Sequence, residues 1–342
     1  MNDQEDLPES NIDINDGFSS LTPDTVMAAV ESLGLWSDGR QMALNSYENR
    51  VYQVGIDESE PVIVKFYRPN RWTDEAILEE QAFCFELAEQ ELPVVLPEVI
   101  GGKTLHHFNG LRFSLFKRRG GRAPEFDNLD NLFILGQTLG QMHTVGAAQS
   151  FRHRPALNIE TFGRKSVETV AATLLPDGMR DNYLAVCHQL LDLIEQQTSK
   201  ADEINWIRCH GDCHVGNILW RDDMPNFVDF DDARTAPAVQ DLWMMLSGER
   251  HHQQVQMLEI LEGYEMFSTF DRRQLHWIEP LRTLRMMHYC AWLAKRWGDP
   301  AFPMHFPWFN TERYWGEHLI ELREQQFALQ EPMYGDDFLK LY

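Results

Sequence analysis

Cysteine is scarce in this 342-residue sequence: there are five, an odd number, scattered along the chain. That pattern argues against a disulfide framework and favours a reducing compartment. Long hydrophobic runs are missing as well, since no apolar stretch reaches the roughly 18 residues of a membrane span. The N-terminus is acidic and polar, unlike a signal or transit peptide. We therefore expect a cytoplasmic protein without a membrane partner.

Basic residues are also in deficit. Lys and Arg number 30 against 53 Asp and Glu, which gives a formal net charge of −23. A phosphate polyanion would find little sequence-independent attraction to such a chain, so we expect no nucleic-acid partner. The simplest consequence of the acidity is solubility, with affinity for a cationic substrate as the alternative. A locally basic cleft is compatible with both.

The chain is long enough for two core-bearing units, and its character changes after residue 119. Residues 1–20 carry few apolar side chains, which predicts a disordered tail. Residues 21–119 open with a short helix whose N-cap is Thr22, and they contain a second helical run at 73–90. Around it lie β-rich runs at 41–46, 50–56, 61–68, 93–100 and 111–118. This order predicts a small α+β unit built on an antiparallel sheet.

In residues 120–342 the apolar side chains recur at three- and four-residue steps, as on the buried faces of helices. The helical runs fall at 128–146, 179–197, 238–267 and 281–297. We predict an α+β fold with two lobes. The N-terminal lobe has a small antiparallel sheet, and the larger C-terminal lobe is mainly helical and holds the polar segment described next.

That segment carries the residues that a chemical step would need. The stretch "HGDCHVGN" places Asp212 and Asn217 five positions apart in a loop. The runs "ILW" and "NFVDF" then predict a β-hairpin, which brings Asp229 back beside Asn217. Amide and carboxylate oxygens are hard ligands suited to Mg²⁺, and Asp212 can accept a hydrogen bond from an attacking hydroxyl. Phosphoryl transfer needs this combination of metal placement and hydroxyl alignment.

The spacing of Asp212 and Asn217 resembles the catalytic loop of protein kinases, and "VDFDD" stands where their D-F-G motif would stand. The H-G-D form is similar to that of aminoglycoside phosphotransferases and choline kinases. Beyond the first 20 residues, segments such as "LNSYENRVYQV", "VIVKFYRPNRW" and "DARTAPAVQDLWMML" closely resemble the bacterial stress response kinase A family. The resemblance implies a protein-kinase-like fold and a monomeric, cytoplasmic kinase. Such a kinase uses ATP and Mg²⁺ to phosphorylate serine or threonine of a protein substrate, which the sequence does not identify.

The same resemblance assigns roles by position. Asp212 would be the catalytic base, and Asn217 and Asp229 would be the magnesium ligands. Asp229 would also be a catalytic residue. Lys65 would contact the ATP phosphates, although a lone lysine in an edge strand is more often a solvated charge. Only the presence of Asp212, Asn217 and Asp229 further along the chain favours a phosphate-binding role for Lys65 over that alternative.

On the nucleotide side, the resemblance also makes Glu80 the ion-pair partner of Lys65, with the adjacent Glu79 as the rival. Ser46 falls in the turn that replaces the phosphate-covering loop, so its hydroxyl is expected to contact ATP. That turn, "NSYENR", has no glycine, which puts a backbone cradle of the protein-kinase type in doubt. Side chains of Ser46 and Asn49 are the expected substitutes.

Three neighbouring features allow alternatives. One of Asp231 and Asp232, with Asp231 the candidate, either touches a second Mg²⁺ or forms an ion pair with Arg234. Asp241 either anchors the catalytic loop by hydrogen bonds or is an ordinary acid at a helix start. The "CHGDCH" run also invites a zinc site, which we disfavour because the cysteine spacing is loose and no second ligand pair follows. The two cysteines are then packing residues, and His210 holds the loop by a backbone hydrogen bond.

The motifs identify the ATP half of the site but not the acceptor, because acceptor pockets are built elsewhere in a fold. A Ser/Thr protein kinase is the leading hypothesis. A small-molecule kinase for an aminoglycoside, choline or a sugar is the alternative, and a non-catalytic pseudokinase is the third possibility. A peptide needs an open cleft facing Asp212, whereas a compact ligand needs a closed acidic or aromatic pocket. Candidate walls, for which core packing is the competing role, are Trp292, Trp297, Trp308 and Asp299.

Overall fold

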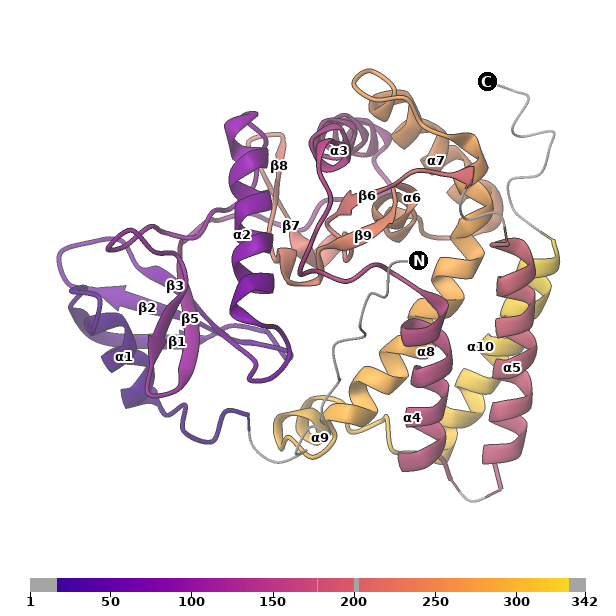
Figure 1. Cartoon of the computed structure of the whole chain (residues 1–342), viewed down its shortest axis with the longest axis horizontal. Coiled ribbons are helices and arrows are strands. Elements are labelled where there is room, and N and C mark those ends of the chain that lie inside the picture. The colour runs from indigo at the N-terminus through magenta and orange to yellow at the C-terminus, as the bar shows by residue number, and fades with distance from the viewer. Residues whose placement is uncertain (1–16, 177, 200–202, 332–342) are drawn as a thin grey trace.

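The structure is a computed structural model that describes residues 17–176, 178–199 and 203–331. It has two lobes: a sheet-based lobe, indigo to purple in Figure 1, and a larger helical lobe, magenta to yellow. The predicted α+β, bilobal architecture is thus confirmed. Of the tail expected at residues 1–20, residues 1–16 lie outside the described part of the chain.

The N-terminal lobe is an antiparallel sheet of five strands in the order β1-β2-β3-β5-β4. The strands are β1 (Ser37–Ala43), β2 (Arg50–Ile56), β3 (Val62–Tyr67), β4 (His106–Phe108) and β5 (Leu111–Lys117). Helix α1 (Pro23–Glu31) precedes the sheet, and α2 (Asp74–Glu89) lies between the sheet and the helical lobe (Figure 1). Strand β3 is therefore central, with a neighbour on each side.

Helix α1 begins where the sequence predicts. The side chain of Thr22 accepts a hydrogen bond from the N–H of Thr25 at 3.2 Å, and Pro23 takes the first helical position. The buried face of α1 packs on alternate strand residues, which are Val54, Ile56, Val64, Phe66, Leu111, Phe113 and Leu115. Because successive strand residues face opposite ways, Lys65 points to the other side of the sheet, toward α2 and the helical lobe.

One predicted strand does not form. Strands β2, β3 and β5 lie where the sequence predicts them, but residues 93–100, all within the described part, form only isolated bridges. Pro93 and Pro97 have no N–H to donate, which interrupts a hydrogen-bonded ladder. The segment links the lobes instead, since Val94 forms a bridge with Phe227.

The C-terminal lobe is mainly helical. Its helices are α3 (Leu129–Ala148), α4 (Lys165–Thr173), α5 (Arg180–Gln197), α6 (Val239–Leu242), α7 (Arg250–Tyr264), α8 (Ile278–Arg296), α9 (Ala301–His305) and α10 (Glu312–Gln330). The run predicted as helical at 238–267 is divided into α6, a 3₁₀ turn and α7, because Gly248 adopts a φ of +78° before α7. Among the described residues, no helix combines the length and apolarity needed to cross a membrane.

Two short sheets frame the catalytic loop. Their strands pair as β6 (Trp206–Cys209) with β9 (Arg234–Pro237), and as β7 (Ile218–Arg221) with β8 (Met224–Phe227). The predicted hairpin is confirmed. Asp222 and Asp223 at its turn have φ values of +53° and +57°, which suits the two-residue turns that match strand twist. The loop that carries Asp212 and Asn217 lies between β6 and β7, so paired strands fix both of its ends.

Helices α3 and α7 touch through their backbones. A Cβ on Gly136 would lie 2.1 Å from the carbonyl oxygen of Ile260, and a Cβ on Gly263 would lie 2.1 Å from that of Phe133. A Cβ on Gly140 of α3 would likewise lie 2.5 Å from the carbonyl oxygen of Tyr264. Glycines on both helices therefore permit an approach that any other residue would prevent. The same two helices carry side chains that anchor the catalytic loop.

Substitution Gly136→Ala should reduce the free energy of unfolding by about 1–3 kcal/mol, because the added methyl group forces α3 away from α7. Gly316→Ala in α10 is the matched control: nothing lies within 4 Å of its Cβ position, so the change should stabilise the helix by about 0.5–1 kcal/mol. Chemical denaturation measures both effects. Wild-type stability of Gly136→Ala would contradict the close helix contact.

Candidate active site

Asp241 fixes the start of the catalytic loop. This residue of α6 is fully buried, and its carboxylate accepts hydrogen bonds from the backbone N–H groups of His210 and Gly211, both at 2.8 Å. His143 of α3 lies 3.1 Å from the same carboxylate, and Tyr264 of α7 hydrogen-bonds the other nitrogen of that ring at 3.0 Å. Burial favours the neutral acid, but these partners outweigh it and lower the pKa of Asp241. The predicted anchoring role of Asp241 is confirmed.

His210 holds the loop from inside, as the sequence predicts. Its Nε2 lies 2.9 Å from the carbonyl oxygen of Val228, and its Nδ1 accepts a hydrogen bond from the N–H of Asp212 at 3.3 Å. Gly211 has a φ of +84°, and a Cβ there would lie 2.2 Å from the carbonyl oxygen of Asp232. Glycine is therefore required between His210 and Asp212.

Asp212 projects from this loop among polar partners on three sides. Its Oδ1 accepts a hydrogen bond from Arg285 of α8 at 2.5 Å, and its Oδ2 lies 3.4 Å from Nε2 of His214. Nδ2 of Asn217 donates to its backbone carbonyl at 2.9 Å. Burial opposes ionisation, but the hydrogen bond with His214 and the charge of Arg285 lower the pKa of Asp212 to about 2. At neutral pH the carboxylate is ionised and can accept a hydrogen bond from a hydroxyl.

The hairpin brings Asn217 and Asp229 together, as predicted. The N–H of Val228 donates to the backbone carbonyl of Asn217 at 3.0 Å, so Asp229 follows directly on a residue bonded to Asn217. Asp229 adopts left-handed backbone angles, φ +59° and ψ +62°, which cost an L-residue about 1–2 kcal/mol. Strain of this kind is typical of functional positions. An amide and a half-exposed carboxylate, both with hard oxygen atoms, fit the ligand chemistry of Mg²⁺.

Lys65 of β3 reaches the same carboxylate from the other lobe. Its Nζ lies 2.6 Å from Oδ1 of Asp229 and 3.4 Å from Oδ1 of Asp231. The side chain is only 8% exposed and the strand is central, so the solvated edge-strand alternative is wrong. Burial alone would lower the pKa of Lys65, but the charges of Asp229 and Asp231 raise it well above its usual value. The lysine is therefore a buried cation held by two aspartates.

The two candidate glutamates have different surroundings. Glu79 accepts hydrogen bonds from the backbone N–H groups of residues 152–154, at 2.6 to 2.9 Å, and so is tied to the helical lobe. Glu80 is buried, and burial raises its pKa to about 7, while Lys65 opposes the increase and Asp231 adds to it.

The expected ion pair between Lys65 and a glutamate is therefore wrong for this structure: within the described residues, the ion pairs of Lys65 go to Asp229 and Asp231. The physical reason is competition. Two aspartates already balance the ammonium group, and a buried carboxyl group whose pKa lies near 7 carries less charge at neutral pH. Glu80 lies near Lys65 as a buried acid, whereas Glu79 faces away from it.

Arg71 is a site residue that the sequence analysis missed. It contacts the carboxylate of Asp231, and its Nη2 lies 2.8 Å from Oδ1 of Asp232. Arg234 binds the same oxygen of Asp232 at 2.7 Å. The expected ion pair with Arg234 is thus formed by Asp232, while the side chain of Asp231 turns inward, 3% exposed, toward Lys65 and Arg71. A second Mg²⁺ at Asp231 stays a prediction.

The turn between β1 and β2, residues 44–49, carries Ser46. Its Oγ donates to the backbone carbonyl of Asn49 at 3.2 Å, inside the turn. Asn49 is buried, and its side-chain oxygen accepts the backbone N–H of Arg68 at 3.0 Å. The amide oxygen of Asn49 thus joins the start of β2 to the end of β3, and contact of its side chain with ATP stays a prediction. Contact of Ser46 with ATP stays a prediction.

All five cysteines are free and buried. Cys209 and Cys213 belong to the hydrophobic core, as the packing alternative to a zinc site predicts. Burial raises the pKa of both thiols well above the usual value. It has the same effect on Cys84, and it raises the pKa of Cys187 and of Cys290 to about 12.

The residues considered as acceptor walls have other partners. Trp292 of α8 donates its indole N–H to Glu48 in the β1–β2 turn, and Asp299 accepts a hydrogen bond from Arg50 at 2.8 Å. The other two tryptophans pack in one aromatic cluster, which contains Trp297, Trp308, Phe309, Tyr314 and Trp315. Packing against the core is thus confirmed for Trp292 and Trp297, whereas Trp308 is exposed. Trp292 and Asp299 also join the two lobes.

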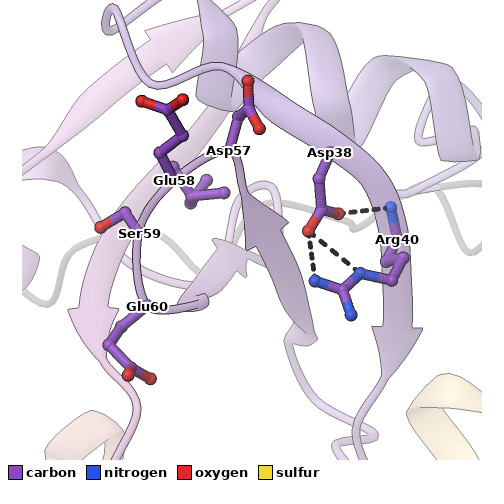
Figure 2. A pocket seen from close by; sticks show the side chains of 7 residues that line it. Asp38, Arg40, Asp57, Glu58, Ser59 and Glu60 are labelled. Carbon is purple, nitrogen blue, oxygen red and sulfur yellow. Dashed lines mark hydrogen bonds and ion pairs between the residues drawn. The ribbon is translucent and has the colours of Figure 1, made fainter.

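A hollow of about 790 Å³ opens elsewhere, on the sheet-based lobe. Figure 2 shows its lining, in which Asp38 binds Arg40 and the acidic turn after β2 faces them. That turn, residues 57–60, follows the C-terminal end of β2. Arg50, at the other end of the strand, lies at the interface between the lobes. The hollow is therefore separate from the catalytic loop.

Comparison with known proteins gives a consistent result. Residues 41–278 match the phosphotransferase enzyme family. The chain is 45% identical to stress response kinase A of Escherichia coli over 318 residues, which cover 92% of this chain and 95% of that protein. It is 42% identical to the serine/threonine protein kinase RdoA of Salmonella typhimurium, with the same coverage of 92% and 95%. Amicoumacin kinase, solved with AMP-PNP and Ca²⁺, has the same fold, with a TM-score of 0.71 at 19% identity over 93% of this chain and 97% of that one.

Removal of the loop anchor should have a local and a global effect. Asp241→Ala leaves two buried N–H groups unpaired, at a cost of about 1–3 kcal/mol each, and amide hydrogen exchange should accelerate in residues 210–217. The control is Asp271→Ala, which removes a surface cap that accepts the N–H of Arg273 at 3.0 Å and should cost only about 1 kcal/mol. Unchanged exchange in the loop of Asp241→Ala would contradict the anchoring role.

Proposed function

The chain belongs to the phosphotransferase enzyme family and, within it, to the stress response kinase A group, and on this premise we propose that it is an ATP- and Mg²⁺-dependent Ser/Thr protein kinase. A protein acceptor is supported by the 42% identity to the serine/threonine protein kinase RdoA. The observation that carries the proposal is the convergence of four side chains from both lobes on one loop and hairpin: Lys65, Asp212, Asn217 and Asp229. A role in a stress response is proposed from the names of the relatives alone.

The nucleotide half of the mechanism uses Lys65, Asn217 and Asp229. Lys65 is cationic because the neighbouring aspartates raise its pKa, and it can bind phosphate oxygens at the boundary between the lobes. Asn217 and Asp229 would hold Mg²⁺, which supplies positive charge against the charge that develops on the transferring phosphoryl group. Strain at Asp229 is consistent with a carboxylate whose direction is set before the ligand arrives.

The acceptor half uses Asp212. A carboxylate with a pKa of about 2 is a weak base, so it is suited to orienting the hydroxyl and receiving its proton late in the transfer. Arg285 and His214 hold its two oxygens, and the hydrogen bond from Asn217 fixes the loop backbone at its centre. In this proposal Asp212 aligns the attacking oxygen, and its low pKa keeps it ionised throughout the neutral range.

Asp229→Ala should abolish phosphoryl transfer and weaken the binding of Mg·ATP, because the variant loses a metal ligand and a partner of Lys65 together. The measurement is an ATP-consumption assay over a series of Mg²⁺ concentrations, with calorimetry for nucleotide binding. Asp222→Asn, a carboxylate change in the exposed hairpin turn, is the control and should behave as wild type. Wild-type Mg²⁺ dependence in Asp229→Ala would remove Asp229 from the metal site.

Asp212→Asn keeps the shape of the side chain and removes its charge, so kcat should fall by about 10²-fold or more while nucleotide binding persists. Radiolabel transfer from ATP tests this together with the acceptor. Wild type should label itself or a generic protein substrate on serine or threonine, and Asp212→Asn should do so at least about 10²-fold more slowly. Label on an aminoglycoside or amino alcohol, and none on protein, would replace the protein-kinase proposal with a small-molecule kinase of the same fold.

A further inference from the structure

A buried carboxylate ties the β1–β2 turn to helix α8. Glu48 lies at the tip of the turn, and its side chain is 14% exposed. Arg296 donates to both of its oxygens, from Nη2 at 2.8 Å and from Nε at 3.0 Å. The indole N–H of Trp292, one turn earlier on α8, donates to the same carboxylate. This set of contacts, which we call the clasp, joins the two lobes directly.

Two further arginines complete the surroundings of Glu48 from its own lobe. Nε of Arg68 lies 3.2 Å and Nε of Arg71 lies 3.7 Å from its Oε1. Burial favours the neutral acid, yet the charges of Arg71, Arg296 and Arg68 together lower the pKa of Glu48. The clasp therefore depends on a charged glutamate, and its loss would remove the carboxylate that the guanidinium of Arg296 binds.

Neighbouring contacts close the same side of the molecule. Asp299, just after α8, binds Arg50 at 2.8 Å and Arg68 at 3.0 Å. Tyr47, beside Glu48, packs against the ring of Phe306 with 4.9 Å between centroids. The turn is thus held by residues on each side of Glu48, and within the described residues its partners in the helical lobe lie in α8 or shortly after it.

The clasp is also connected to the catalytic residues. Arg71 contacts both Glu48 and Asp231, and Asp231 in turn binds Lys65. A continuous chain of charges therefore runs from the tip of the turn to the lysine assigned to ATP. Displacement of Glu48 would change the balance of charge around Arg71 and hence around Lys65.

We propose that Glu48 is a positioning residue, whose clasp with Arg296 holds the β1–β2 turn in place over the nucleotide. The inference rests on the proposed function and on the expectation, taken from the family resemblance, that this turn covers the ATP phosphates. A turn without glycine has little freedom to wrap around a ligand, so its position has to be supplied by contacts at its tip. A turn ordered before binding spares the nucleotide the entropic cost of ordering it, and nucleotide release requires the clasp to open.

The experiment measures nucleotide binding directly, in the full-length protein, with a fluorescent ATP analogue and Mg²⁺ in a stopped-flow instrument. Glu48→Gln and Arg296→Met should each raise the Kd and the dissociation rate about 10-fold, which corresponds to about 1.4 kcal/mol. KM for ATP should rise in parallel, while kcat stays within about threefold. Because both variants break the same clasp, the Kd of the double variant for the nucleotide should be no higher than that of either single variant.

Two further variants keep the test decisive. Glu317→Gln removes an exposed ion pair with Arg313 in α10, at 2.8 Å, and should leave nucleotide binding unchanged. Arg296→Lys keeps the positive charge but loses the bidentate geometry, so its Kd should lie between those of wild type and Arg296→Met. This variant still tests the clasp if a thermal melt shows that Glu48→Gln is unstable.

Unchanged or tighter nucleotide binding in the folded clasp variants would overturn the inference, since tighter binding would mean that the clasp keeps nucleotide out. Additive effects in the double variant would also overturn it. Failure of the wild-type protein to bind Mg·ATP at all would instead contradict the proposed function. The two failures are therefore distinguishable in one data set.

Discussion

Lys65 is a buried cation that lies between the aspartates of the opposite lobe, and much of the site depends on that balance of charge. A buried ammonium group is costly unless partners compensate for its lost hydration, so β3 and the hairpin segment with Asp229 and Asp231 have to stay together. Arg71 binds the other side of Asp231, which extends the same requirement to the start of α2. The position of one sheet against one hairpin thus follows from electrostatics, whereas the helices behind them are arranged by apolar packing.

The parts of the site that lie within one stretch of sequence could be predicted from it. Asp212, Asn217 and Asp229 fall within a loop and a hairpin whose turn residues are visible in the sequence, so their proximity follows from local rules. Asp241 lies shortly after the hairpin at a helix start, but its hydrogen bonds to the loop were expected from the family resemblance and not from local rules. The interruption of residues 93–100 was also within reach, because Pro93 and Pro97 signal it directly.

Contacts between distant positions could not be predicted in this way. Arg71 and Asp231 are 160 positions apart, and Glu48 and Arg296 are 248 positions apart, so no periodicity connects them. The expected ion pair between Lys65 and Glu80 failed for a different reason. Neighbouring helix residues point about 100° apart, which follows from 3.6 residues per turn, and of the two glutamates it is Glu80, as the sequence analysis chose, that lies near Lys65. Competition from Asp229 and Asp231 then changed the ion pair itself.

The buried cysteines have a practical consequence for work on this protein. Alkylating reagents and peroxides attack the thiolate, and each of the five native thiols is buried with a raised pKa. The folded chain therefore offers such reagents almost no nucleophile at neutral pH. A single cysteine introduced on the surface, for example beside the β1–β2 turn, could carry a fluorophore or spin label in an otherwise native background. Reaction of the native thiols would then report unfolding of the core around them.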